Sequence, residues 1–118
     1  MDWPAAIDSA PEVDIETRRG EGAPVHRTTI WAVVADGDVF VRSLKGASGR
    51  WYRELMSDPV AVVHAQGDAF PVRAVPASDP GSVERASEAL RRKYSDSRSL
   101  ESMLEDDILD TTVRLEPR

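Results

Sequence analysis

A cluster of cations and small residues lies in the middle of the sequence, between residues 42 and 53. This segment holds four basic residues and no acid, with two glycines and two serines among them. Lys45 and Arg50 flank the glycine-containing run 46–49, after which helical spacing begins. Charge-assisted donors beside a loop that opens a helix suit a phosphate group. The segment therefore predicts a site for one small anionic ligand, with a solvated basic loop as the alternative.

The charge distribution of the 118-residue chain supports a local site of this kind. The net charge is −6, but residues 1–17 carry −5, residues 18–53 carry +4 and residues 54–118 carry −5. An acidic chain with one basic segment lacks the broad positive surface typical of nucleic-acid or membrane binding. There is no apolar run of 18 residues and no secretory signal pattern. We therefore expect a cytoplasmic protein with a small-molecule ligand and no nucleic-acid or membrane partner.

Other kinds of chemistry lack the residues that they need. Cysteine is absent, which excludes disulfides, thiolate nucleophiles and thiolate metal ligands. His26 and His64 stand far apart and without metal-ligand spacing, so we expect no metal and no serine-histidine-aspartate triad. We interpret His64 as a hydrogen-bonded core residue and His26 as a surface residue. The acids at 106, 107 and 110 are interpreted as a solvated face.

Strands must position the basic segment, because most of the chain shows β-branched or alternating apolar patterns. Asp36-Gly37 is a strong hairpin signal. Residues 28–35 are apolar on both parities, which favours a strand buried on both faces or one in the wall of a filled barrel. Pro71 favours an edge or bulged strand. The six predicted strands span residues 13–18, 28–35, 38–44, 60–65, 70–75 and 111–115.

Helical spacing is confined to three segments. Residues 50–56 follow the basic loop, Asp79-Pro80 begins a second helix that runs toward Tyr94, and residues 99–109 form a third. Residues 1–12 are acidic and contain two prolines, which predicts an irregular N-terminal arm, although Trp3 and Ile7 could dock on the body. This order of elements predicts one domain at residues 13–118, a small antiparallel barrel with flanking helices.

Several segments together resemble a known superfamily. Val39 to Ser43, the Lys45-Gly46 loop, the Trp51-Tyr52 pair and the Asp58-Pro59-Val60 strand start follow one another. This succession resembles the flavin-binding split-barrel superfamily of pyridoxamine-phosphate-oxidase-like proteins, above all its small deazaflavin-dependent nitroreductase branch and uncharacterised short relatives. The resemblance covers residues 13–117. It implies a mainly β fold, a six-stranded antiparallel split β-barrel that is α+β in composition, and a homodimer.

The resemblance also implies roles for individual residues. The implied set is Lys45 and Arg50 for a cofactor phosphate or acidic tail, Thr29 and Ser43 for the ring system or its chain, Trp51 for bracing the loop or stacking, and Tyr94 for the substrate side. Arg50 stands where the deazaflavin branch often has an apolar residue or proline, so FMN and deazaflavin both stay open. Packing alone would also explain Trp31, Trp51 and Tyr94.

Three functions follow from these observations. The first is an FMN- or deazaflavin-dependent oxidoreductase that acts on a small organic molecule by hydride transfer. The second is a cofactor-free small-molecule-binding protein, or a cofactor-independent enzyme, on the same scaffold. The third is a structural interaction module. Whether the chain is an enzyme stays open at this point, and flavin-induced thermal stabilisation separates the first function from the others.

Overall fold

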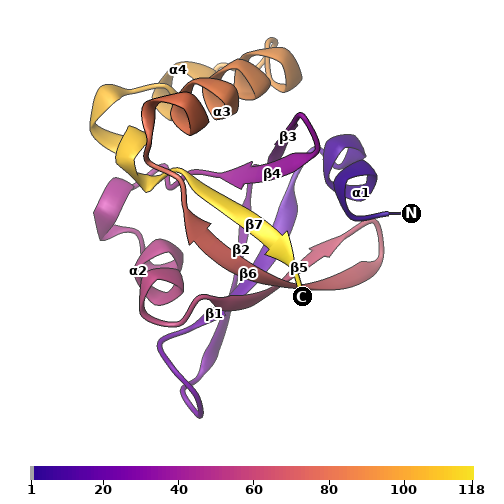
Figure 1. The fold of residues 1–118 in the computed structure, drawn as a ribbon, viewed down its shortest axis with the longest axis vertical. Helices are drawn as coiled ribbons and strands as arrows, with labels where there is room; N and C mark the ends of the chain where they lie inside the picture. The colour runs from indigo at the N-terminus through magenta and orange to yellow at the C-terminus, as the bar shows by residue number, and fades with distance from the viewer. Residues whose placement is uncertain (1) are drawn as a thin grey trace.

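The computed structural model describes residues 2–118 and contains one antiparallel sheet with short helices around it (Figure 1). The elements follow one another in the order α1 (Trp3–Ser9), β1 (Val13–Arg18), β2 (Val25–Ile30), β3 (Val33–Ala35), β4 (Asp38–Val41), η1 (Gly46–Ser48), α2 (Arg50–Ser57), β5 (Val60–Ala65), β6 (Asp68–Pro76), α3 (Pro80–Lys93), α4 (Leu100–Met103), η2 (Asp106–Thr111) and β7 (Val113–Pro117).

The sheet has seven strands in the order β2-β1-β5-β6-β7-β4-β3, and every neighbouring pair is antiparallel. It curls on itself, so that β2 and β4 lie across from each other in Figure 1. The predicted fold class, a mainly antiparallel barrel with flanking helices, is confirmed. The strand count is seven rather than six.

The extra strand arises because residues 28–35 do not form one strand. The chain breaks at Trp31 and Ala32, and the two parts, β2 and β3, become the opposite edges of the sheet. The prediction of one continuous strand over residues 28–35, whether buried on both faces or in the wall of a filled barrel, was therefore wrong. In β2 exposed and half-buried residues alternate, because an edge strand of a curled sheet presents one face to solvent.

Two tight hairpins have the backbone that their turns require. Asp36 and Gly37 have φ of 52° and 85°, as a type I′ turn needs, which confirms the predicted hairpin between β3 and β4. Gln66 and Gly67, with φ of 54° and 80°, join β5 to β6. Pro71 does not mark an edge strand, because β6 pairs with both β5 and β7. It lies one residue beyond the last β6–β7 pair, Val72 with Pro117, where a missing N–H costs no bond to β7.

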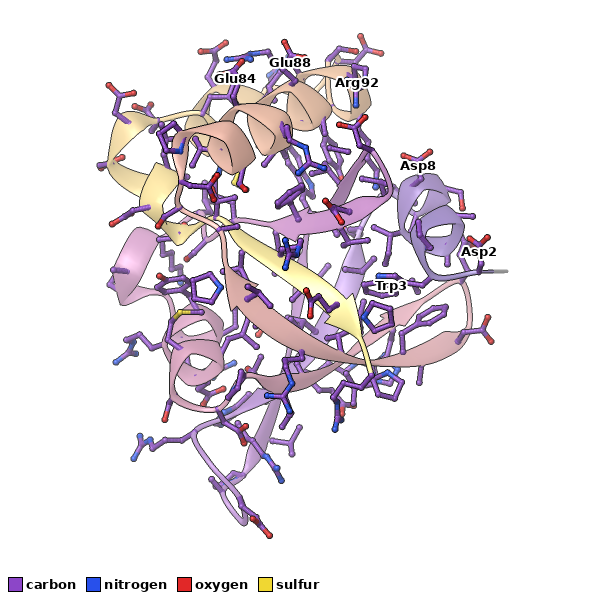
Figure 2. The ribbon with its side chains drawn as sticks, viewed as in Figure 1. Asp2, Trp3, Asp8, Glu84, Glu88 and Arg92 are labelled. Atoms are coloured by element: carbon purple, nitrogen blue, oxygen red, sulfur yellow. The ribbon has the colours of Figure 1, made fainter. Side chains whose placement is uncertain are left out.

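The N-terminal segment forms the helix α1 instead of an irregular lead-in. The Asp2 side chain caps it by accepting from the Ala5 N–H at 3.0 Å. Trp3 and Ile7, four residues apart, share one face and are both buried in the barrel core. Figure 2 shows Trp3 directed toward the sheet and Asp8 on the outer side of α1. The docking that these two residues suggested is thus present, and burial of this face holds the segment helical.

The C-terminal helices differ in how far they follow the predicted pattern. Asp79 caps α3 by accepting from the Ser82 N–H at 3.0 Å, as predicted. Glu84, Glu88 and Arg92 lie along the outer side of α3 in Figure 2. The predicted helix at residues 99–109 is instead the short α4 followed by the 3-10 helix η2, because the backbone becomes extended at Glu105.

Buried apolar residues form two clusters on opposite sides of β3 and β4. The first fills the barrel and includes Ile15, Leu55 and Val72. The second lies under α3, α4 and η2 and includes Phe40, Leu90 and Tyr94. The strand β4 contributes to both, since Val39 and Val41 belong to the first cluster and Phe40 to the second. The loop that leaves β4 therefore begins from a rigid position.

Candidate functional site

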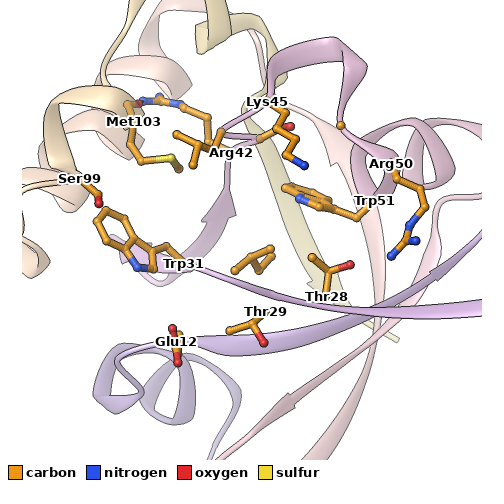
Figure 3. A pocket seen from close by; sticks show the side chains of 14 residues that line it. Glu12, Thr28, Thr29, Trp31, Arg42, Lys45, Arg50, Trp51, Ser99 and Met103 are labelled. Atoms are coloured by element: carbon orange, nitrogen blue, oxygen red, sulfur yellow. The ribbon is translucent and has the colours of Figure 1, made fainter.

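A cavity of about 530 Å³ opens between β2, the end of β4 and the start of α2 (Figure 3). Its size lies within the range of small-molecule sites. It brings together segments from four parts of the chain, and its lining consists of Glu12, Thr28, Thr29, Ile30, Trp31, Arg42, Ser43, Leu44, Lys45, Gly49, Arg50, Trp51, Ser99 and Met103.

The loop between β4 and α2 is held in shape by its own hydrogen bonds. The Ser43 N–H donates to Thr111 Oγ1 at 3.0 Å, and Ser43 Oγ donates to the Gly46 carbonyl at 2.8 Å. Gly49 packs against the same hydroxyl, and a Cβ there would lie 2.6 Å from Ser43 Oγ. Only glycine fits at Gly49 without a shift of the loop. Ser43, predicted to contact a cofactor, lines the cavity and also uses its proton to shape the loop.

Lys45 and Arg50 lie at the two ends of this loop and border the cavity. Both side chains are exposed, and within residues 2–118 neither side chain has a hydrogen bond or an ion pair. Arg50 is the first residue of α2, whose leading backbone N–H groups lack helical acceptors. These free donors and charges are the groups that an anion would engage.

Arg42 also lines the cavity but is satisfied by the protein. It is 3% exposed, and burial lowers its pKa to about 10, with a smaller contribution from Arg91, so it stays protonated at neutral pH. Its guanidinium donates to four neutral acceptors: Thr112 Oγ1 at 2.9 Å, Ser87 Oγ at 3.0 Å, the Met103 carbonyl at 3.0 Å and the Val83 carbonyl at 3.2 Å. No carboxylate among the described residues pairs with it.

Two consecutive threonines on β2 have different environments. Thr29 donates its hydroxyl proton to Asp14 at 2.6 Å, and this hydrogen bond, followed by the one from Arg27, lowers the pKa of Asp14. Thr28 Oγ1 is buried, and it has no hydrogen-bond partner within residues 2–118. An unpaired buried hydroxyl costs free energy unless a ligand satisfies it. Of these two threonines that line the cavity, Thr28, which the sequence did not single out, is therefore the one whose hydroxyl is buried and unpaired.

Aromatic residues form the two ends of the lining. Trp51 is almost fully buried beside Lys45, and its ring meets Tyr52 edge to face at 6.3 Å. Trp31 lies at the other end, near Ser99 and Glu12 (Figure 3). Its ring is stacked on Tyr94 with centroids 3.8 Å apart and planes at 3°. Tyr94 is 9% exposed and lies behind Trp31, outside the lining.

Five of the six residues predicted for the site therefore line one cavity, and Tyr94 is one layer further back. The residues that sequence reasoning left out are mainly Thr28 and Trp31, together with Glu12, Leu44, Ser99 and Met103. The sequence could have distinguished Thr28 from Thr29, because consecutive side chains of a β-strand point to opposite faces of the sheet. No sequence pattern around residues 99 and 103 indicated that they would line the same cavity.

The histidines lie outside this cavity. His64 Nε2 is 2.8 Å from Glu16 Oε1, which confirms the predicted hydrogen bond, but His64 is half-buried and does not lie in the core as predicted. His26 is more than a surface residue, because its Nδ1 lies 2.7 Å from an oxygen of Glu54, which is buried and also accepts from Thr17. Within residues 2–118 no group of three or more histidine, aspartate or glutamate side chains could hold a metal ion.

Comparison with solved structures identifies the class of fold. The chain is similar to a putative pyridoxamine 5′-phosphate oxidase from Listeria innocua, with a TM-score of 0.65 and 14% identity over 97% of this chain and 87% of that one. It is similar to an F420-H2 dependent reductase (FDR-A), with a TM-score of 0.67 and 15% identity over 90% and 93%. HutZ, the heme storage protein from Vibrio cholerae, has a TM-score of 0.66 and 11% identity over 93% and 83%. The fold is that of the pyridoxamine-phosphate-oxidase-like split barrels, as the sequence resemblance implied.

The sequence itself places the chain in one family. It belongs to the family described as uncharacterized protein conserved in bacteria (DUF2255), whose model matches residues 5–115. Comparison of the sequence with curated proteins finds no match. In the part of the chain that the structure describes, no helix is long and apolar enough to cross a membrane.

Proposed function

We propose that the cavity binds FMN or a deazaflavin coenzyme, and that the protein is an oxidoreductase acting on a small organic molecule by hydride transfer. The observation that carries the proposal is the pair of unpaired cations, Lys45 and Arg50, at the mouth of a cavity of ligand size. The FDR-A and Listeria innocua structures share this fold, and their names refer to F420 and to a pyridoxamine-phosphate oxidase.

The lining fits a phosphate-bearing planar cofactor on three counts. Lys45, Arg50 and the free backbone N–H groups at the start of α2 offer donors for a phosphate. Thr28 lines the cavity, and its unpaired Oγ1 is buried in the free protein, so a turn of this side chain toward a bound polar ring or chain would give the hydroxyl a partner. The absence of a Cβ at Gly49 lets the loop fold back against Ser43 and holds Lys45 and Arg50 at the cavity.

A flavin or deazaflavin, when bound, supplies the acceptor and donor of the hydride, so the chain needs few catalytic groups of its own. Lys45 and Arg50 bind the phosphate, and Ser43 keeps the loop that carries them in position. Thr28 orients the ring-bearing part, with Thr29 fixed next to it by Asp14. Trp51 excludes water from the buried side. Glu12 is the one carboxylate in the lining, which is consistent with chemistry that depends on positioning more than on acid-base catalysis.

The proposal includes a homodimer. The edge strand β2 forms one wall of the cavity and has no partner on its outer side within the described chain. Val25 on this strand is 58% exposed, and unpaired edges with exposed apolar residues favour association. Light scattering at working concentration is expected to give twice the 13.0 kDa chain mass. A monomer mass would overturn this part of the proposal and leave the cofactor site to be tested separately.

The test of the cofactor site is a titration of the purified protein with FMN and with F420, followed by cofactor fluorescence and melting temperature. One of the two is expected to raise the melting temperature, because a ligand that binds only the folded state stabilises it. Lys45→Ala and Arg50→Ala are each expected to weaken binding roughly tenfold, the worth of one charge-assisted hydrogen bond.

Arg53→Ala is the matched control, because Arg53 is an exposed arginine of the same helix that does not line the cavity. It is expected to bind like the wild type. If neither cofactor binds, or if all three variants bind equally well, the proposal fails. A cofactor-free small-molecule-binding protein on the same scaffold then becomes the better description.

A further inference from the structure

Trp31 borders the cavity at the end opposite Lys45 and Arg50 (Figure 3). One face of its indole is covered by Tyr94, with ring centroids 3.8 Å apart. The Trp31 side chain is also among those that line the cavity. An aromatic ring that is supported by a second ring and borders a cavity can serve as a stacking surface for a planar group.

This surface is held by contacts that are independent of any ligand. The hydroxyl of Tyr94 donates to the Pro11 carbonyl at 2.7 Å, which fixes the ring behind Trp31. Lys93 Nζ donates to the Ala32 carbonyl at 2.7 Å and the Ile7 carbonyl at 2.8 Å, which fixes the backbone next to Trp31. The ring therefore needs little ordering when a ligand arrives, and pre-organisation of this kind favours affinity.

Glu12 gives this end of the cavity a charge opposite to that of the other end. It is exposed, follows Pro11 directly, and lies near Trp31 in Figure 3. Within residues 2–118 it has no ion pair or hydrogen bond of its own side chain. The face of an indole and a nearby carboxylate both attract a cation or a polarised N–H group. The cavity is thus basic at the Lys45 and Arg50 end and acidic and aromatic at the Trp31 end.

We propose that Trp31 and Glu12 form a substrate subsite that selects a planar, nitrogen-bearing ring that is cationic or donates N–H groups. The assignment of this ring as the substrate rests on the proposed function, while the subsite itself rests on the geometry of Trp31, Tyr94 and Glu12. Trp31 stacks on the ring, Tyr94 supports Trp31 as a positioning residue, and Glu12 pairs with the nitrogen.

The test uses three probes and calorimetry, first without any cofactor and then with FMN or F420 added. The probes are 4-aminoquinoline, which is planar and protonated at neutral pH, quinoline, which is planar and neutral, and cyclohexylamine, which is cationic and not planar. The wild type is expected to bind 4-aminoquinoline roughly tenfold more tightly than either of the other two. Equal binding of cyclohexylamine and 4-aminoquinoline would overturn the proposal.

Variants separate the contributions of the two side chains. Trp31→Leu is expected to lose roughly tenfold in affinity for 4-aminoquinoline, whereas Trp31→Phe keeps most of it. Glu12→Gln is expected to weaken 4-aminoquinoline severalfold and leave quinoline unchanged. Trp3→Phe, a tryptophan of α1 outside the cavity, is the matched control and is expected to bind like the wild type. Unchanged affinity in Trp31→Leu would overturn the subsite.

If Trp31→Leu does not fold, nuclear magnetic resonance of the wild type tests the subsite instead. Binding of 4-aminoquinoline is expected to shift the indole signals of Trp31 and not those of Trp3, and the reverse would overturn the subsite. Failure of the subsite is distinguishable from failure of the cofactor site. If FMN and F420 both fail to bind while 4-aminoquinoline shifts Trp31, the cofactor proposal is wrong and the subsite stands. If a cofactor binds and no probe does, only the subsite is wrong.

Discussion

Arg42 and the pair Lys45 and Arg50 all line the cavity, but their surroundings are opposite. Arg42 is buried and its guanidinium donates to four oxygen atoms of the protein. The side chains of Lys45 and Arg50 are exposed and donate to no oxygen atom of residues 2–118. Burying a charge is costly unless hydrogen bonds compensate it. The arrangement thus assigns Arg42 to holding the fold together and leaves Lys45 and Arg50 for a ligand.

Replacement of Arg42 is expected to have the largest effect on stability. Arg42→Met leaves the oxygens of Thr112, Ser87, Met103 and Val83 without their donor, and we expect the free energy of unfolding to fall by about 2–4 kcal/mol. Urea denaturation measures the change. Arg50→Met, at an exposed position without partners, is expected to change stability by less than about 0.5 kcal/mol. Equal losses in the two variants would remove the distinction between the two sets of cations.

A smaller loss is expected at the loop that carries the free cations. Gly49→Ala brings a Cβ to within 2.6 Å of Ser43 Oγ, although the φ of −63° at Gly49 is open to alanine. We expect a loss of about 1–3 kcal/mol in unfolding free energy from the forced shift, together with weaker cofactor binding. Gly20→Ala is the control, because nothing lies within 4 Å of a Cβ there. A Gly49→Ala variant as stable as Gly20→Ala would show that the close approach does not hold the loop.

Thr28 and Thr29 give the same comparison for uncharged groups, one without a hydrogen-bond partner and one with a partner. Its buried Oγ1 has no partner in the described chain, so Thr28→Val should leave the stability of the free protein unchanged or raise it by up to about 1 kcal/mol. Thr29→Val instead loses the hydrogen bond to Asp14 and should not gain stability. Thermal denaturation of both variants, with and without cofactor, makes the comparison. A Thr28→Val variant that is less stable than Thr29→Val without cofactor would contradict an unsatisfied hydroxyl.

The smallest effect concerns Asp14 on the outer face of the sheet. The hydrogen bonds from Thr29 and Arg27 lower its pKa in the folded state, so its carboxylate stabilises the fold above the pKa of the unfolded chain. This contribution is lost as the pH falls through the folded-state pKa. Between about pH 5 and pH 3, Asp14→Asn should therefore lose stability less steeply than the wild type, by no more than about 0.5 kcal/mol because the site is exposed. If the unfolding free energies of the wild type and Asp14→Asn change in parallel with pH, the lowered pKa of Asp14 is contradicted.

Local signals in the sequence predicted the features that depend on neighbouring residues. The hairpin at Asp36-Gly37, the cap at Asp79 and the strands at residues 13–18 and 60–65 are all present. The loop with Lys45 and Arg50 was recognised in the same way, because glycine, charge and helical spacing occur together within a few residues.

Features that depend on distant contacts could not be predicted in this way. The chain breaks at Trp31 because β2 and β3 belong to opposite edges of a closing sheet, which no window of residues reveals. Tyr94 was placed at the substrate side, but its ring packs behind Trp31, 63 positions earlier in the chain. The helix at α1 also depends on burial of Trp3 and Ile7 in a core built from later strands.

The central claim is that Lys45 and Arg50 bind a cofactor phosphate, and a comparison of FMN with riboflavin tests it most directly. Riboflavin is FMN without the phosphate, so the ratio of the two dissociation constants measures what the protein gains from that group. The account predicts that the wild type and Arg53→Ala bind FMN roughly tenfold more tightly than riboflavin. If the titration shows F420 to be the ligand instead, the same ratio is expected between F420 and the deazaflavin that lacks the phosphate-bearing side chain. It predicts that Lys45→Ala/Arg50→Ala binds the two ligands almost equally. An unchanged ratio in the double variant, or no preference of the wild type for the phosphate-bearing form of whichever cofactor it binds, would contradict it.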